Sequence, residues 1–220
     1  MVETDERPPI RVLVVDDHAM VAESLRRLLD TCRDIEVLEV AGTAGDGVRA
    51  AARLRPDVVL MDYELPDGDG VTAAARIKQD RPATKVVMLT AAGDDERVAL
   101  RALEAGCSGF LGKARPVDEL LASVRAAQAG EALIAPSMLV RLLPRLERTY
   151  EGVGTSLSRR EVQVLNAMAN GSSDKEIADE LGIAHNTART HVQSILRKIG
   201  AHSKLEAVVI AVRQGVIRPI

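Results

Sequence analysis

The chain of 220 residues is poor in aromatic residues and in cysteine. It has no tryptophan, one phenylalanine and two tyrosines, so its hydrophobic cores must be built from aliphatic side chains. Its two cysteines, Cys32 and Cys107, match no metal-binding or redox spacing. This small number favours a reducing compartment and argues against a secreted scaffold held together by disulfides.

The sequence also lacks long hydrophobic runs. No apolar segment approaches the roughly 20 residues that a membrane-spanning helix requires. The first ten residues, MVETDERPPI, are charged and contain no apolar segment typical of a signal peptide. We therefore expect a soluble cytoplasmic protein that has no membrane partner.

Charge and composition divide the chain into unequal parts. Residues 1–130 carry a net charge of −6, whereas residues 156–220 carry +3. Between them lies APSMLVRLLPRLERTYEGVGTS, which has one short helical pattern followed by a tail rich in glycine, serine and threonine. We predict a first domain at 8–129, a linker with a short helix at 130–155, and a second domain at 156–220.

In the first domain, short apolar segments alternate with segments whose apolar residues recur at helical spacing. IRVLVV, DVVLM and TKVVML are almost wholly apolar, as strands covered on both faces should be. Five such units predict an α/β fold with a doubly wound, five-stranded parallel sheet. The predicted strands are 10–15, 35–40, 57–61, 84–89 and 109–111, and the predicted helices are 19–30, 44–54, 71–80, 95–105 and 116–129.

The second domain is marked by helix-capping patterns. Serine and glutamate stand three residues apart at Ser158, Ser173 and Ser203, which is the spacing of a capping box at a helix start. Glycine follows each predicted helix, at positions where helices commonly end. The pattern predicts a small all-α domain with helices near 159–170, 174–181, 186–199 and 203–214.

Polar side chains stand at the ends of four predicted strands. Asp16 and Asp17 follow the first strand, Asp62 the third, Thr90 the fourth and Lys113 the fifth. The carboxyl ends of parallel strands meet at one edge of the sheet, where ligands bind. Clustered carboxylates need a cation, and hard oxygen ligands favour Mg²⁺. Such a site predicts phosphoryl transfer, with an aspartate as nucleophile and a lysine and a hydroxyl contacting phosphate oxygens.

Residues 10–129 resemble the receiver domain of two-component response regulators. The resemblance rests on DD after the first strand, MDYELPDGDG after the third, and Thr90, Phe110 and Lys113. It implies that Asp62 accepts the phosphoryl group and that Thr90 and Phe110 form the switch pair. It also implies a flavodoxin-like fold, and Mg²⁺ held at Asp62 by Asp16, Asp17 and the backbone carbonyl of Glu64.

The segment 186–199, NTARTHVQSILRKI, has one apolar and one polar face. Ala188, Val192, Ile195 and Ile199 form the apolar stripe. A shorter helix precedes it through the tight turn GIAH, which is helix-turn-helix spacing. The polar face is therefore a candidate for reading a DNA major groove.

Residues from LSRREVQVL to SKLEAV resemble the LuxR-type DNA-binding domain, and both domains together resemble the NarL/FixJ class. The resemblance implies double-stranded DNA and a sensor histidine kinase as partners, and a homodimer formed through helix 203–214. Asp174 stands where Asn is usual in this family, so we expect extra negative charge near the DNA. The resemblance places Arg189, Thr190 and Gln193 at base edges and Thr187, Arg197 and Lys198 at phosphates.

Together these features predict a transcriptional regulator controlled by phosphorylation, which is not itself an enzyme. Two alternatives remain open at this point. One is a Mg²⁺-dependent phosphatase of the haloacid dehalogenase type, because Glu64 follows Asp62 at the spacing of a second carboxylate. The other is a receiver that regulates through protein contacts without phosphorylation.

Overall fold

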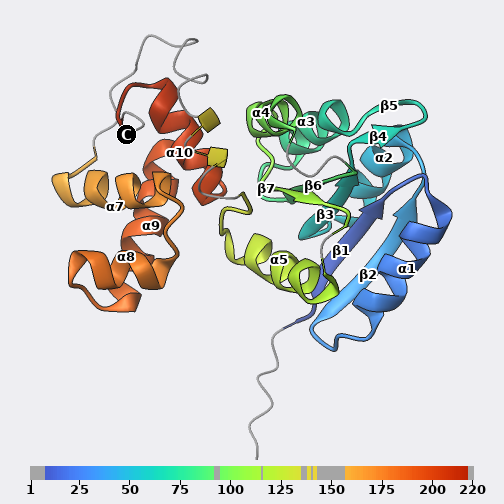
Figure 1. The fold of residues 1–220 in the computed structure, drawn as a ribbon, viewed down its shortest axis with the longest axis horizontal. Helices are drawn as coiled ribbons and strands as arrows, with labels where there is room; N and C mark the ends of the chain where they lie inside the picture. Colours follow the sequence, from blue (N-terminus) through green and yellow to red (C-terminus); the bar gives the residue numbers. More distant parts are fainter. Residues whose placement is uncertain are drawn as a thin grey trace, which may run out of the picture.

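The computed structural model describes residues 8–91, 95–114, 116–134, 138–139, 141–142 and 157–217. Within them, an α/β domain is followed by a bundle of helices (Figure 1). Each predicted strand and helix is present, with its ends within one residue of the prediction. None of the helices in the described ranges is long and apolar enough to span a membrane.

The first domain contains a parallel sheet with strand order β2-β1-β3-β6-β7, as in flavodoxin-like folds. This confirms the predicted fold class. A short antiparallel pair, β4 and β5, follows β3 and was not predicted. The strands are β1 (Ile10–Val15), β2 (Ile35–Ala41), β3 (Val58–Asp62), β4 (Glu64–Leu65), β5 (Gly68–Asp69), β6 (Lys85–Thr90) and β7 (Gly109–Gly112).

Both faces of the sheet are covered by helices. Alternate residues of each central strand enter different cores, because successive side chains of a strand point to opposite faces. Leu13 and Val59 pack in the core with α2, α3 and α4, whereas Val12 and Val58 pack with α1 and α5. The helices are α1 (Ala19–Asp30), α2 (Ala44–Leu54), α3 (Gly70–Asp80), α4 (Glu96–Glu104) and α5 (Val117–Ala129).

The second domain consists of α7 (Arg159–Ala169), α8 (Asp174–Leu181), α9 (His185–Ile199) and α10 (Lys204–Arg213). Full capping boxes begin α7 and α8. At α10, Ser203 accepts the Glu206 N–H, but the Glu206 carboxylate accepts the His202 N–H instead of the Ser203 N–H. The third predicted capping box is therefore only half formed.

The beginning of the predicted linker packs against the sheet. Leu133 lies beside β7, where its carbonyl accepts the Phe110 N–H and its own N–H donates to Ser108. A Cβ atom at Gly109 would lie 2.2 Å from the Leu133 Cβ, so only glycine allows this approach. Residues 138–139 and 141–142 are helical, and residues 143–156 of the linker lie outside the described ranges.

We expect Gly109→Ala to destabilise the first domain, because the added methyl group forces Leu133 away from β7. Overpacking of this kind costs about 1–3 kcal/mol in the free energy of unfolding. Urea denaturation followed by circular dichroism measures the change. The control is Gly42→Ala, since a Cβ there meets no atom within 4 Å. Equal stability of the two variants would contradict the close packing of Leu133.

Candidate functional site

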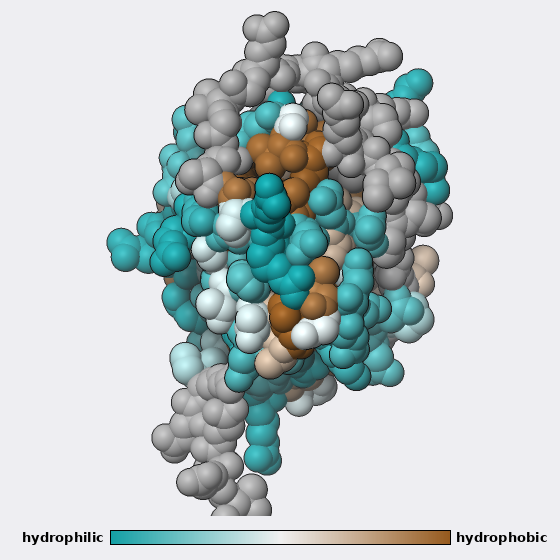
Figure 2. Space-filling view, turned by 90° about the vertical axis from the view of Figure 1, so that its left-hand side faces the viewer, coloured by the Kyte–Doolittle hydropathy of each residue, from teal (hydrophilic) through white to brown (hydrophobic). Residues whose placement is uncertain are grey.

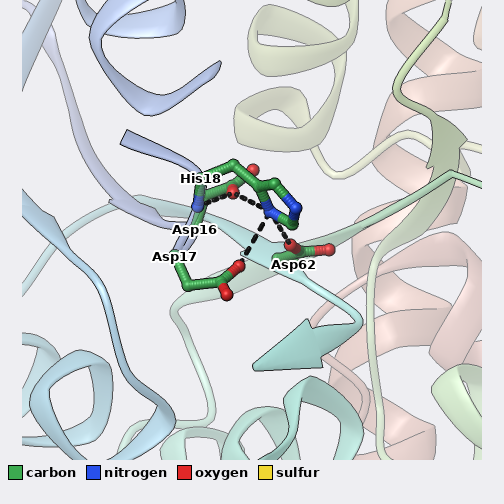
Figure 3. Close-up of side chains that lie close together, drawn as sticks. All are labelled: Asp16, Asp17, His18 and Asp62. Atoms are coloured by element: carbon green, nitrogen blue, oxygen red, sulfur yellow. Dashed lines mark hydrogen bonds and ion pairs between the residues drawn. The ribbon is translucent and has the colours of Figure 1, made fainter. Parts of the chain in front are cut away.

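Three carboxylates meet at the carboxyl edge of the sheet, next to His18 (Figure 3). Asp16 and Asp17 follow β1, and Asp62 is the last residue of β3. The side chain of Asp16 is fully buried and that of Asp62 is 4% exposed, while Asp17 is 34% exposed. One ligand atom from each of the four residues lies within 4.8 Å of the others.

Lys113 is the cation that approaches the two buried carboxylates. Its Nζ lies 2.6 Å from Asp62 Oδ2 and 2.7 Å from Asp16 Oδ2. The residue directly follows β7, and its backbone N–H donates to the carbonyl of Thr90 at 2.7 Å, which ties it to the end of β6. The predicted convergence of strand ends is therefore present in the structure.

Burial and the neighbouring charges shift the pKa of both Asp62 and Lys113. The pKa of the Asp62 carboxyl is raised, first by burial and further by the charge of Asp16, while the hydrogen bond from Lys113 opposes the rise. Burial lowers the pKa of the Lys113 ammonium, but its hydrogen bonds to Asp16 and Asp62 outweigh burial, so that its pKa is raised. Lys113 therefore remains a cation, and its hydrogen bond favours the ionised form of Asp62.

The loop after Asp62 is closely packed. The Glu64 N–H donates to Asp62 Oδ1 at 3.4 Å, and the Gly70 N–H donates to the Tyr63 carbonyl at 2.8 Å. A Cβ at Gly70 would lie 1.9 Å from the carbonyl oxygen of Asp62. The first residue of α3 must therefore be glycine to lie this close to the Asp62 backbone. These contacts fix the backbone around Asp62. The backbone carbonyl of Glu64 as a metal ligand remains a prediction.

The two predicted switch residues flank the site. Thr90 ends β6, pairs with Gly112 of β7, and is 3% exposed. Phe110 is 6% exposed and belongs to the core on the α4 face of the sheet. Both residues therefore lie near the end of the strand pair that carries Lys113, and their roles as a switch remain a prediction.

The charge of this pocket fits a divalent cation. Counted at their formal charges, three carboxylates and one ammonium leave an excess of two negative charges. Their oxygens are hard donors, gathered at one point and partly open to solvent through Asp17. Asp16, Asp17 and Asp62 would hold Mg²⁺, which would neutralise charge on an entering phosphoryl group.

His18 was not predicted as a site residue. Its Nδ1 lies 2.8 Å from Asp17 Oδ1, 3.3 Å from Asp16 Oδ1 and 3.8 Å from Asp62 Oδ2. The sequence feature that could have identified His18 as a site residue is its position directly after Asp16 and Asp17.

Comparison with known proteins identifies both domains. Residues 12–125 match the model of the response regulator receiver domain, and residues 155–211 match that of bacterial regulatory proteins of the luxR family. The chain belongs to the two-component response regulators with a LuxR-type DNA-binding domain. The receiver and the DNA-binding domain of this family therefore correspond to the two parts of the fold described above.

Individual relatives agree with this assignment. The chain is 36% identical to the response regulator protein VraR of Staphylococcus epidermidis, over 95% of this chain and 99% of the relative. It is also 36% identical to the transcriptional regulatory protein LiaR of Bacillus subtilis, over 94% and 99%. Among solved structures, the response regulator ChrA of a heme-sensing two-component system covers 96% of this chain and all of its own, with a TM-score of 0.51 and 31% identity.

In the DNA-binding domain of this response regulator, α9 has a buried and an exposed face. Its apolar stripe, from Ala188 to Ile199, is buried in the domain. The polar face is open in this structure, so the receiver does not cover it. The exposed residues include all six that were predicted to contact DNA: Thr187, Arg189, Thr190, Gln193, Arg197 and Lys198.

One of these six is already paired within the domain. Lys198 Nζ lies 2.7 Å from Glu161 Oε2 of α7, and the Glu161 side chain is only 5% exposed. Glu161 also accepts hydrogen bonds from Ser194 and from the backbone N–H of Ser158. Lys198 therefore stabilises the packing of α9 on α7, in addition to its predicted contact with phosphate.

Asp174 lies against the start of α10. Its Oδ1 lies 2.7 Å from Lys204 Nζ, and its side chain is 16% exposed. Lys204 also contacts Glu131 at 2.5 Å, so one cation is shared by two carboxylates and the group keeps a net negative charge. The expected extra negative charge near the DNA therefore stays a prediction.

The receiver contacts the DNA-binding domain through α10 and the turn that precedes it. Lys85 of β6 donates to the carbonyl of His202, and Arg213 lies 3.6 Å from Glu104 of α4. Lys78 of α3 lies 3.8 Å from Glu206, and burial lowers the pKa of its ammonium despite the charge of that glutamate. Most of α10 is buried, whereas the polar face of α9 is not.

Apolar side chains also reach the surface of this domain. Figure 2 shows them as a band on the side that α7, α8 and α10 form in Figure 1, bordered by hydrophilic residues. Leu157, Val162 and Ile210 are among the apolar residues of the domain that are only partly buried. The helices of this small domain therefore do not enclose all of its apolar surface within the described ranges.

We expect Glu161 to make the DNA-binding domain sensitive to acid. The hydrogen bond from Lys198 lowers the pKa of Glu161 to about 2; burial opposes this, and the Ser158 N–H and Ser194 add to it. Because the pKa is lower in the folded state, the stabilisation is present above about pH 4.5 and is lost as pH falls toward 2. It amounts to at most about 3 kcal/mol.

Urea unfolding followed by NMR signals of α7 and α9, at several pH values within and above this window, measures the effect. Glu161→Gln should flatten the dependence of stability on pH. Glu180→Gln, at an exposed carboxylate of α8, is the control. An unchanged pH dependence in Glu161→Gln would show that the Glu161 carboxylate does not carry this stabilisation.

Proposed function

We propose that this response regulator is a sequence-specific transcriptional regulator that is switched by phosphorylation of Asp62. A partner histidine kinase donates the phosphoryl group, and Mg²⁺ is the cofactor. The observation that carries the proposal is the convergence of Asp16, Asp62 and Lys113 at the carboxyl edge of the sheet. Lys113 Nζ lies within 2.7 Å of a carboxylate oxygen of each aspartate. The exposed polar face of α9 supports DNA as the target.

The chemistry follows from the contacts of Asp62. An Asp62 oxygen attacks phosphorus as the bond to the donor breaks, and the product is an acyl phosphate. Bound Mg²⁺ would offset the negative charge of the three carboxylates and of the phosphoryl group. Lys113 exchanges its contact with Asp62 Oδ2 for one with a phosphoryl oxygen. Thr90, at the end of the neighbouring strand, donates a hydrogen bond to another.

A groove beside the site supports docking of the kinase. It lies between α1 and α5 and is lined by Met20, Leu25, Leu111, Lys113 and Leu120. Met20 is 85% exposed, which is unusual for a large apolar side chain. The groove therefore offers an apolar surface next to Lys113, within reach of the nucleophile.

The signal reaches the DNA-binding domain through α4. Arg101 of α4 donates to the Tyr63 hydroxyl at 3.2 Å and to Asp69 at 2.8 Å, so α4 is attached to the loop that follows Asp62. The same helix ends at Glu104, which contacts Arg213 of α10. A phosphoryl group that rearranges this loop therefore changes the surface on which α10 rests. A shift from mostly inactive to mostly active requires roughly 3–5 kcal/mol.

Dimer formation is part of the proposal. The active protein pairs through α10, and two DNA-binding domains then contact a two-fold symmetric site. In this structure α10 is largely buried and contacts the receiver through Lys204, Glu206 and Arg213. Pairing through α10 therefore requires these contacts to separate, which links the phosphorylation site to assembly on DNA.

Incubation of the protein with Mg²⁺ and acetyl phosphate should add one phosphoryl group, as measured by intact mass. Asp62→Asn should abolish the gain, because it removes the carboxylate whose oxygen attacks phosphorus. The control is Asp67→Asn, in the same loop, whose carboxylate accepts the N–H groups of Ala44 and Gly45. Wild-type protein that gains nothing would favour regulation through protein contacts alone.

Two substitutions on α9 should separate base readout from phosphate contact. We expect Gln193→Ala to relax the base preference by about 1–3 kcal/mol at one position. Arg197→Ala should weaken binding equally on all sequences and lower the salt slope by about 1. We choose Arg197 rather than Lys198 for the phosphate contact, because Lys198→Ala would also remove the ion-pair partner of Glu161.

Fluorescence anisotropy at several salt concentrations, with specific and scrambled duplexes, measures both effects. Arg33→Ala, at an exposed arginine of the receiver, is the control for loss of one positive charge. The same profile for Gln193→Ala and Arg197→Ala would show that the two roles are assigned wrongly.

A further inference from the structure

The imidazole of His18 is directed into the acidic pocket. Figure 3 shows the ring above Asp62, with Nδ1 facing oxygens of Asp16, Asp17 and Asp62. The three N···O distances are 3.3, 2.8 and 3.8 Å. The nitrogen therefore lies at the point where the carboxylates converge, although the side chain is 60% exposed and is not held there by burial.

The position of His18 in the backbone leaves its imidazole free of a capping role. His18 occupies the N-cap position of α1, but its side chain makes no capping hydrogen bond. Its N–H donates to Asp16 Oδ1 at 2.9 Å, which fixes the residue beside the pocket. The ring therefore has no role in starting the helix.

We propose that His18 is a nitrogen ligand of the cation site, and that it gives this pocket a preference for first-row transition-metal ions over Mg²⁺. The inference rests on the proposed function, because it concerns the same pocket. Mg²⁺ binds oxygen ligands and keeps several waters, so an imidazole adds little to its affinity. Cobalt, nickel and zinc ions accept imidazole together with carboxylates, and their affinity for such sites is generally higher.

The donor set is consistent with this assignment. Asp16, Asp17 and Asp62 supply hard oxygens, and His18 would supply a softer donor within 4.8 Å of them. Ligation requires the imidazole proton to be on Nε2, so that Nδ1 exchanges its contact with Asp17 for the metal. In the competing interpretation, His18 only donates a hydrogen bond to the carboxylates. The two interpretations differ in whether the ring contacts the ion.

The experiment uses the full-length protein with Co²⁺ and Mg²⁺ as probes. Isothermal titration gives the Kd of each ion for wild type, His18→Ala and a control, His185→Ala, which removes an exposed histidine of α9. We expect His18→Ala to raise the Kd of Co²⁺ by about ten-fold or more and that of Mg²⁺ by less than about three-fold. His185→Ala should leave both values unchanged.

NMR gives a second readout that does not depend on affinity. Ring protons of His18 bound to Co²⁺ should show large paramagnetic shifts, which His18→Ala removes and His185→Ala retains. An equal change of both Kd values in His18→Ala, or ring signals of His18 without such shifts, would overturn the proposal and leave His18 as a hydrogen-bond donor.

The inference and the proposed function fail in different ways. Wild-type protein that gains no phosphoryl group from acetyl phosphate in Mg²⁺ refutes the proposed function. Wild-type protein that is phosphorylated, but whose ratio of Co²⁺ to Mg²⁺ affinity equals that of His18→Ala, refutes the inference alone.

Discussion

The contact of Lys113 with Asp16 and Asp62 is the interaction on which the rest of the structure depends. Asp62 is almost fully buried beside Asp16, and both its burial and the charge of Asp16 raise the pKa of its carboxyl. The ammonium of Lys113, from the end of β7, opposes both effects. These groups meet because a parallel sheet brings the ends of β1, β3 and β7 to one edge. The same arrangement leaves an excess of negative charge that a divalent cation can balance.

In the proposed mechanism, the coupling between the domains passes through two partly exposed contacts of α4. Arg101 joins α4 to the loop after Asp62 through both Tyr63 and Asp69, and its side chain is 45% exposed. At the end of the same helix, Glu104 lies 3.6 Å from Arg213 of α10. Partly exposed ion pairs contribute little net stability. Both contacts can therefore rearrange within the few kcal/mol that the proposed switch requires.

Much of the fold and of the acidic pocket could be predicted because position in the sequence determines position in space for these elements. A residue at the carboxyl end of a parallel strand lies at the ligand edge, which is how Asp62 and Lys113 were found. Long or exposed side chains do not follow such a rule. The direction of the His18 ring and the pairing of Lys198 with Glu161 depend on tertiary packing. The docking of α10 depends on the arrangement of two domains, for which the sequence contains no periodic signal.

The placement of α9 and α10 determines which step the proposed switch acts on. The receiver contacts α10 and leaves the polar face of α9 exposed, so one copy can approach a major groove without any rearrangement. A single recognition helix contacts only a few base pairs, whereas two linked helices gain affinity because the second binding event is intramolecular. In the proposed mechanism, control over α10 therefore acts on the pairing of two copies. In the proposed mechanism, phosphorylation at Asp62 increases occupancy of the two-fold site by releasing α10, while the residues that read the bases stay as they are.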